Sequence, residues 1–167
     1  WMREQGPHFG IDPNRMIAAG DSAGGQMSVA LAMTLRDLGL PQVIGMLLLY
    51  PVLGGNLDTP SYLRNANAKS LSRAEMRFYL ESFLGPPGSP AWNDEKALPL
   101  LTRNVEGLPP AFITVAEHDP LLDDGVMFHE TLRRGGGVSA LRREPALGHS
   151  YLRARHYSVA ALEGFQA

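Results

Sequence analysis

The sequence contains no cysteine in its 167 residues. A disulfide framework and a metal site built from thiolates are therefore both excluded. The sequence also lacks a large net charge, because its 15 Lys and Arg residues nearly balance its 17 Asp and Glu residues. Nucleic-acid-binding proteins carry a basic surface, whereas the arginine pairs here, Arg133–Arg134 and Arg142–Arg143, are expected on solvated faces. Nucleic acid is accordingly not an expected partner.

Long hydrophobic runs are also missing. The longest, residues 46–53, is interrupted by Pro51 and is far too short to cross a bilayer. No signal peptide is recognisable at the start, and residues 1–5 (W-M-R-E-Q) do not resemble a natural beginning. We therefore expect no membrane span and a missing N-terminus. The compartment is unknown from the sequence, with a cytoplasmic location favoured.

Two kinds of hydrophobic segment alternate along the chain. Short apolar runs bounded by turn residues predict strands at 16–19, 43–53, 111–116 and 139–145. Amphipathic stretches predict helices after the first strand, over 72–84, 123–134 and 152–165. This alternation is typical of an α/β domain with a parallel sheet. We expect one domain over residues 1–167, with a mostly parallel sheet of about four strands, flanking helices and the charged fourth strand at an edge.

The apolar spacing also predicts which helix positions face the core. These are Met27, Leu31, Leu35 and Leu38 in the first helix, Met76, Tyr79, Leu80, Phe83 and Leu84 in the second, and Val159, Leu162 and Phe165 in the last. Ser72 and Glu75 have the spacing of a capping box, which predicts that the second helix starts there. Residues 54–69 have no clear period and are expected to form a loop.

One stretch, R-M-I-A-A-G-D-S-A-G-G at 15–25, organises the rest of the chain. A strand, a tight turn and a helix follow one another here, and the glycines around Ser22 match G-x-S-x-G, the pattern of a nucleophile elbow. The serine of such a turn has a strained backbone, and we expect Gly20 and Gly24 to lack β-carbons that would clash where strand and helix cross. The helix N-terminus after Ser22 would present free N–H groups to a developing anion.

A serine hydroxyl needs a base to take its proton and a carboxylate to orient that base. Asp119 follows the third expected strand and His149 follows the fourth, in the chain order Ser, Asp, His of an α/β-hydrolase. The carboxyl ends of parallel strands lie at one sheet edge, so the three residues should meet there. Glu117, Asp123 and Asp124 are alternative carboxylates; Asp123 and Asp124 are more simply explained as caps of the following helix. His118 is expected to be structural.

Several motifs resemble those of the hormone-sensitive-lipase-like esterases, which have an α/β-hydrolase fold. They are G-D-S-A-G-G at 20–25, A-E-H-D-P-L-L-D-D-G at 116–125, G-H-S at 148–150, F-G-I-D-P-N-R at 9–15 and G-L-P-P-A at 107–111. The resemblance implies Ser22 as nucleophile, Asp119 as carboxylate and His149 as general base, with the Ala23 N–H as an oxyanion donor. Gly20, Asp21, Gly24 and Gly25 complete the elbow without a bond-making role, and Gly25 should serve close packing. By the same resemblance, residues 54–90 form a cap-like insertion, and its 60–90 region is expected to contribute to the acyl-side wall of the pocket.

Two features depart from that family. Ser150 stands where the family has a glycine after the catalytic histidine. The family's H-G-G-G oxyanion loop lies well upstream of the nucleophile, where this chain has only about 20 residues, so the chain resembles the C-terminal half of such an enzyme. The strand at 16–19 would then have an open edge, which a homo-oligomer could cover.

We therefore expect a serine carboxylesterase that hydrolyses short-chain acyl esters through an acyl-enzyme, with a small-molecule ester as its partner. No cofactor is implied, and no metal either, because no two histidines near His118, Asp119 and Asp123 have ligand spacing. Two alternatives stay open. The chain could be a fragment without a competent site, or a ligand-binding module; plant gibberellin receptors use this fold in that way, but they lack the histidine that His149 supplies here.

Overall fold

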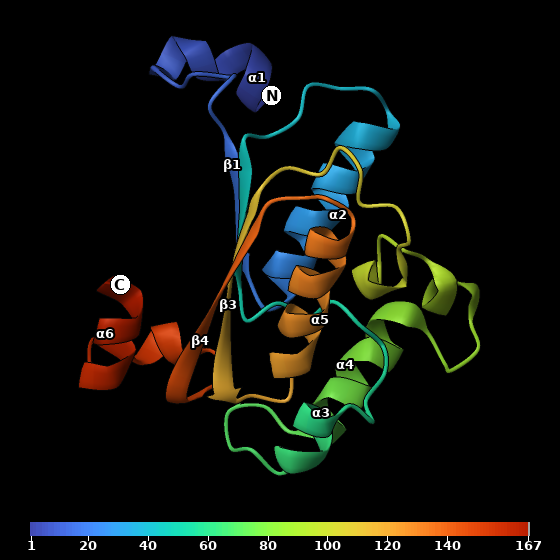
Figure 1. The fold of residues 1–167 in the computed structure, drawn as a ribbon, viewed down its shortest axis with the longest axis vertical. Coiled ribbons are helices and arrows are strands. Elements are labelled where there is room, and N and C mark those ends of the chain that lie inside the picture. The colour runs from blue at the N-terminus through green and yellow to red at the C-terminus, as the bar shows by residue number, and fades with distance from the viewer. Residues whose placement is uncertain (167) are drawn as a thin grey trace.

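The computed structural model describes residues 1–166. Four parallel strands form one sheet in the order β1-β2-β3-β4, so each strand pairs with its neighbours in the sequence (Figure 1). The strands are β1 (Ile17–Asp21), β2 (Gly45–Leu49), β3 (Ala111–His118) and β4 (Ser139–Gly148). The expected α/β class, the parallel sheet and the edge position of the fourth strand are confirmed.

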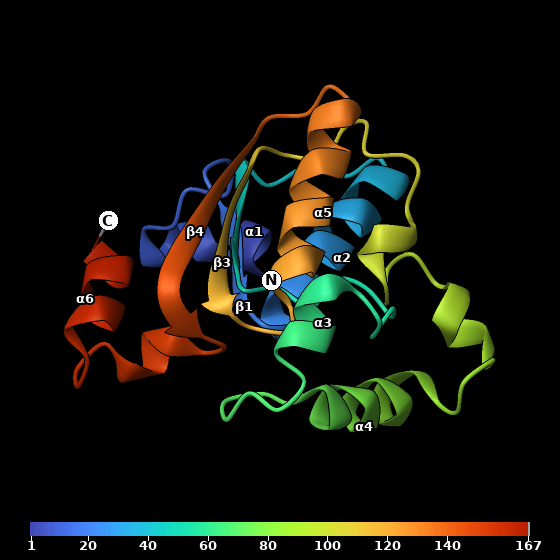
Figure 2. The same cartoon turned by 60° about the horizontal axis from the view of Figure 1, so that its bottom comes forward.

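Helices cover the sheet on both faces and extend beyond one end of it. Their bounds are α1 (Met2–Gln5), α2 (Ala23–Asp37), α3 (Pro60–Arg64), α4 (Arg73–Leu84), α5 (Leu122–Arg134) and α6 (Val159–Gln166). Helices α2 and α5 lie side by side on one face, and α6 lies on the other (Figure 1). Helices α3 and α4 lie beyond the carboxyl ends of the strands (Figure 2). Within residues 1–166, no helix is long and apolar enough to cross a membrane.

The main core fills the space between the sheet and helices α2 and α5. Its fully buried members include Val29, Ala32 and Met33 from α2, Leu48 from β2, Ile113 from β3, and Phe128 and Leu132 from α5. The predicted buried face of α2 is therefore wrong, since Met27, Leu31 and Leu38 are all largely exposed. The helix carries two apolar stripes, and the one with the smaller side chains faces the sheet, where it allows a close approach.

Two predicted elements are shorter than expected. The apolar run 43–53 is a strand only as far as Leu49, because Tyr50 has φ 37° and Pro51 follows it. The predicted helix 152–165 is split into a 3₁₀ turn at Tyr151–Ala154 and the short helix α6. Of α6, only Ala161 is buried. In both places a local backbone conformation overrides a continuous apolar pattern.

The segment between β2 and β3 builds a second core of its own. Leu57, Tyr62, Leu71, Met76, Leu80, Leu84, Leu98 and Leu121 pack together there. The capping box of α4 is confirmed, because Ser72 Oγ accepts from the Glu75 N–H and the Glu75 carboxylate accepts from the Ser72 N–H. The predicted stripe is correct for Met76, Leu80 and Leu84, whereas Tyr79 and Phe83 are exposed. Helix α3 lies where a loop was predicted.

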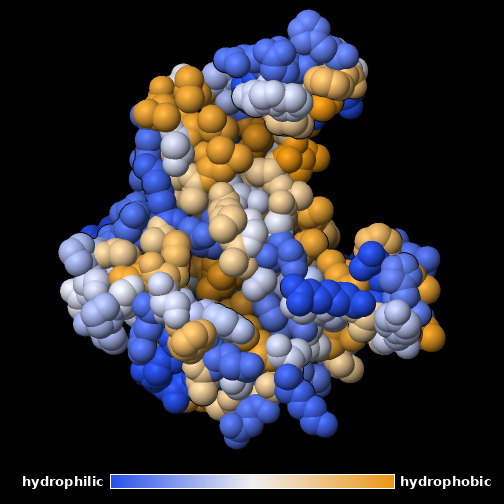
Figure 3. All heavy atoms as spheres, turned by 180° about the vertical axis from the view of Figure 1, so that it is seen from behind, coloured by the Kyte–Doolittle hydropathy of each residue, from blue (hydrophilic) through white to orange (hydrophobic). Residues whose placement is uncertain are grey.

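The sheet face opposite α2 and α5 is only partly covered. Tyr151 and Ala161 cover the β4 side of this face. Toward β1, Ile17 is 60% exposed and Phe112 is 41% exposed. From behind, hydrophobic side chains gather beside the N-terminal helices (Figure 3). Strand β1 is also an edge of the sheet, as the sequence predicts.

Candidate active site

The turn between β1 and α2 has the backbone strain that a nucleophile elbow requires. Ser22 lies between the last residue of β1 and the first of α2, with φ 54° and ψ −117°. A Cβ on Gly20 would lie 2.1 Å from the Gly24 carbonyl oxygen, and one on Gly25 would lie 2.6 Å from Pro51 Cβ. A Cβ on Gly24 would meet nothing within 4 Å. The steric argument thus holds for Gly20 and Gly25, but it is wrong for Gly24, which contributes its main chain to the crossing.

Hydrogen bonds fix this turn to the adjacent strand. The Ser22 N–H donates to the Leu49 carbonyl oxygen at 2.9 Å, and the Val52 N–H donates to the Ser22 carbonyl oxygen at 3.2 Å. The main chain of Ser22 is therefore held on both sides. Such anchoring can offset the cost of a positive φ in a residue that has a Cβ.

Ser22, His149 and Asp119 meet at the carboxyl end of the sheet. In the neutral imidazole form, the Ser22 hydroxyl donates to His149 Nε2 at 3.0 Å, and His149 Nδ1 donates to Asp119 Oδ2 at 2.8 Å. The other carboxylate oxygen, Oδ1, accepts from the Leu121 N–H at 2.9 Å. Asp119 is fully buried and His149 is 8% exposed. Water therefore has little access to the bond between them.

The alternative carboxylates are held elsewhere. Exposed Glu117 accepts from the Ala146 N–H, which keeps its pKa below its usual value. Asp123 accepts from the Ser61 N–H at 2.7 Å, and Ser61 Oγ in turn accepts from the Asp123 N–H at 3.1 Å. The interpretation of Asp123 as a helix cap is therefore wrong, because it binds α3 instead.

Asp124, the third of the alternative carboxylates, binds the loop that follows β2. Its Oδ2 accepts from the N–H groups of Leu53 and Gly54, each at 2.8 Å. Burial raises the pKa of Asp124 to about 7, against the lowering effect of these two donors. Asp124 is thus not a cap either. Three carboxylates within residues 119–124, from the end of β3 into the first turn of α5, thus bind His149, the insertion and the β2 loop separately.

The start of α2 supplies one group suited to a developing anion. Ala23 is the first residue of the helix, so its N–H belongs to the four that have no partner within the helix. The N-terminal dipole adds to this positive potential. The triple glycine at 135–137 lies at the other end of the sheet, between α5 and β4, and is not an oxyanion loop.

Tyr50 is a component of the site that the sequence analysis did not single out. Its ring packs edge-on against His149, with centroids 5.1 Å apart at 70°, and against Tyr151 at 5.3 Å. It is 2% exposed and has φ 37°. The sequence signal that could have singled out Tyr50 is a bulky residue directly before Pro51, inside the run 43–53 that predicts a strand.

An apolar cavity of about 400 Å³ opens beside Ser22. Side chains from the elbow, from Val52 and from the insertion line it: Ser22, Ala23, Gln26, Met27, Val52, Met76, Tyr79, Leu80, Phe83, Ala97 and Leu98. The exposed face of α4 accordingly has a place in the site, since Tyr79 and Phe83 lie on this wall. Within residues 1–166, no group of three or more His, Asp or Glu side chains could hold a metal ion.

Comparison with known proteins identifies the family. A family model described as the alpha/beta hydrolase fold matches residues 1–153. The chain belongs to the α/β-hydrolase family. Carboxylesterase NlhH of Mycobacterium tuberculosis is 39% identical to it over 156 residues, which are 91% of this chain and 48% of that protein. Ethyl acetate hydrolase of Pseudomonas putida is 30% identical over 156 residues, 92% of this chain and 48% of that protein.

Solved esterase structures share this arrangement of elements. The thermostable carboxylesterase EstE1, from a metagenomic library, superposes with a TM-score of 0.90 at 30% identity, over 98% of this chain and 56% of that chain. A thermostable esterase from Pseudomonas putida gives 0.91 at 29% identity, over 99% and 52%. This α/β-hydrolase chain therefore spans about half the length of the relatives it matches. The resemblance to the esterase family and to part of its fold is confirmed.

Proposed function

We propose that this α/β-hydrolase chain carries the triad of a serine carboxylesterase, with Ser22 as nucleophile, His149 as general base and Asp119 as the carboxylate that orients it. The observation that carries the proposal is the continuous chain of hydrogen bonds from Ser22 Oγ through His149 to Asp119, at 3.0 and 2.8 Å. The names of the esterase relatives support the same reaction class.

The reaction proceeds by acyl transfer. Ser22 Oγ forms a bond to the ester carbonyl carbon while its proton passes to His149 Nε2, and Asp119 stabilises the imidazolium. The tetrahedral oxyanion accepts a hydrogen bond from the Ala23 N–H. His149 then gives its proton to the alcohol oxygen as the carbon–oxygen bond breaks. Water, deprotonated by His149, attacks the acyl-enzyme, and His149 returns that proton to Ser22 Oγ as the bond to the acyl carbon breaks and the acid leaves.

The acyl group occupies the apolar cavity beside Ser22. A volume of about 400 Å³ and walls of Val52, Tyr79, Leu80 and Phe83 suit a short acyl chain. In this proposal the insertion at 54–90 forms one wall of the site. Because the N–H of Ala23 is the one oxyanion donor that the elbow motif supplies, we expect slow turnover. The loss of a single donor typically costs ~10²–10³ in rate.

Hydrolysis of p-nitrophenyl esters tests this proposal directly. We expect activity on the acetate and butyrate, a smaller kcat/KM on the laurate, and loss of activity in Ser22→Ala. Ser82→Ala, which removes an exposed serine hydroxyl on α4 that does not line the apolar cavity, is the matched control. Folded wild-type protein without activity, or equal activity in Ser22→Ala, would refute the proposal and leave the fold as a fragment or a ligand-binding module.

A further inference from the structure

A second cavity, of about 960 Å³, adjoins the proposed site at His149 and Ser150. It shares no lining residue with the apolar cavity. One wall is residues 63–70 of the insertion, and the other comprises His118 and residues between 146 and 161. The base thus lies between two cavities of different chemistry, one apolar and one bordered by polar side chains.

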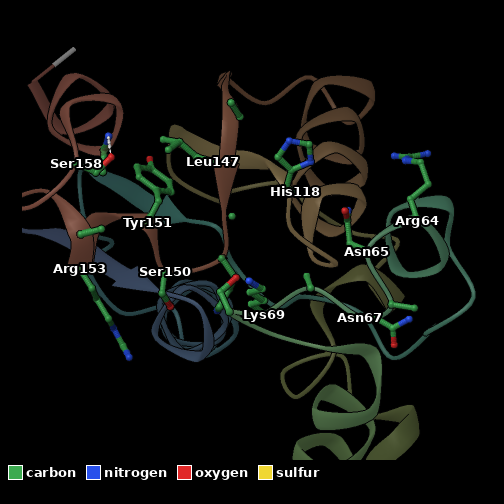
Figure 4. A pocket seen from close by; sticks show the side chains of 18 of the residues that line it. Arg64, Asn65, Asn67, Lys69, His118, Leu147, Ser150, Tyr151, Arg153 and Ser158 are labelled. Carbon is green, nitrogen blue, oxygen red and sulfur yellow. Dashed lines mark hydrogen bonds between the residues drawn. The ribbon is translucent and has the colours of Figure 1, made fainter.

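Cationic side chains line this second cavity, and carboxylates do not. Arg64, Lys69 and Arg153 are among its lining residues, whereas no Asp or Glu is. Lys69 is drawn between Arg153 on one side and Arg64 on the other (Figure 4). Like charges placed around one cavity raise its positive potential and attract an anion.

These three cations are also unpaired, unlike others on the surface. Among residues 1–166, Arg36, Arg73, Lys96 and Arg142 each form an ion pair with an Asp or Glu. No ion pair or side-chain hydrogen bond of Arg64, Lys69 or Arg153 occurs in that part of the chain. Their charges are therefore available to a ligand.

The proposed roles of Ser22 and His149 indicate which part of an ester each cavity would bind. Ser22 and Ala23 line the apolar cavity, where the acyl group would lie. His149 must reach the alcohol oxygen in order to protonate it as it leaves. The alcohol part therefore extends past His149 and Ser150, which is where the cationic cavity begins.

We propose that this cavity binds a negatively charged group, a carboxylate or a phosphate, on the alcohol part of the substrate. The inference rests on the proposed esterase function and narrows its substrate class to esters with an apolar acyl chain and an anionic alcohol. Lys69 is the central contact because of its position between the two arginines.

Three aryl acetates test the preference. The carboxylate is carried by 4-acetoxybenzoate and the phosphate by 4-acetoxyphenyl phosphate, while methyl 4-acetoxybenzoate is neutral. The quantity compared is the ratio of kcat/KM for each anionic ester to that for the neutral ester. Comparing this ratio between protein variants cancels the intrinsic reactivities of the esters. The anion that shows the larger effect identifies the group that the cavity prefers.

We expect Lys69→Met with Arg153→Met to lower the ratio for at least one anion by roughly 2- to 20-fold, the range for two exposed charge contacts. Lys96→Met removes one positive charge outside the cavity and should leave the ratio unchanged. Salt should compress the wild-type ratio, since exposed charges are screened. Ratios that are equal in wild type and the double variant for both anions would overturn the proposal.

A binding measurement separates this inference from the esterase proposal. In Ser22→Ala protein, 4-hydroxybenzoate should bind more tightly than its methyl ester, and the double variant should remove that difference. This binding measurement needs no turnover, so it tests anion binding in the cavity even if the wild-type protein hydrolyses no ester. Equal affinity for the acid and its methyl ester would overturn the anion site, whereas absent hydrolysis of all esters would refute the proposed function alone.

Discussion

The ring of Tyr50 stands at 70° to the imidazole of His149, with the two centroids 5.1 Å apart. Tyr50 occupies this place at the cost of a positive φ of 37°, which is rare for a bulky residue. Its N–H donates to the Thr114 carbonyl oxygen at 2.8 Å, which anchors it to β3. A strained, buried aromatic residue beside the proposed base is best explained as a positioning residue for that base.

Tyr50→Leu should lower kcat by about 2- to 10-fold with little change in KM, because an edge-on aromatic contact is worth ~0.5–1.5 kcal/mol. Tyr50→Phe keeps the ring and should restore most of the rate. Steady-state kinetics on p-nitrophenyl butyrate measures both. A purely structural role would instead lower the fraction of active protein in both variants and leave kcat per active site unchanged, as titration with an organophosphate would show.

Asp119→Asn should lower kcat by ~10³–10⁴-fold with little change in KM, since an amide leaves the imidazole in the wrong tautomer and without an anion beside it. Glu117→Gln, two residues earlier and exposed, serves as the comparison. An unchanged rate in Asp119→Asn would transfer the carboxylate role to Glu117 or a neighbour.

Asp124 should make stability depend on pH. Its pKa rises from 3.8 to about 7 on folding, so the folded state binds more protons than the unfolded state between these values. Its contribution to stability is therefore fully present below about pH 4 and is lost as pH rises through about 7. Asp124→Asn can still accept from the loop but cannot ionise, so its stability relative to wild type should increase from about pH 4 to 8.

Urea denaturation at a series of pH values measures this difference, with a slope of at most ~1.4 kcal/mol per pH unit. Glu106→Gln, at an exposed position, reports the effect of removing one surface charge. A difference between Asp124→Asn and wild type that stays constant across the range would show that Asp124 is ionised in the folded protein throughout.

Gly20→Ala should destabilise the protein by more than about 2 kcal/mol, because its Cβ would overlap the main chain of Gly24 at 2.1 Å. Gly24→Ala adds the same methyl group where nothing lies within 4 Å. It should be neutral or stabilising by up to about 1 kcal/mol, since alanine favours a helix. Chemical denaturation of the two variants compares them; equal stability would contradict the steric account of the elbow.

The order of elements and the meeting point of the proposed triad could be predicted because both follow from chain order. Ser22, Asp119 and His149 each come at or after the end of a strand, and parallel strands bring those ends to one edge. Packing choices could not be predicted in the same way. Which stripe of α2 faces the sheet depends on how closely the helix approaches, and the pattern of Met27 and Leu31 contains no such information.

The elbow motif predicts the strained backbone of Ser22, but no pattern predicts the positive φ of Tyr50. The run 43–53 is largely apolar, and its interruption at Pro51 does not reveal that the strand stops at Leu49 and that Tyr50 then packs against His149. The partners of Asp123 and Asp124 lie more than 60 residues away along the chain, so no local motif reveals them.

Residues 119–124, which lead from β3 into the first turn of α5, connect segments whose fluctuations would otherwise be independent. Asp119 holds His149, Asp123 holds the N-terminus of α3, and Asp124 holds the loop after β2, which itself donates to the carbonyl oxygen of Ser22. Amide protons in these segments should therefore exchange with solvent as one cooperative unit. An opening that releases the insertion should therefore also loosen the contacts that hold Ser22 and His149 in place.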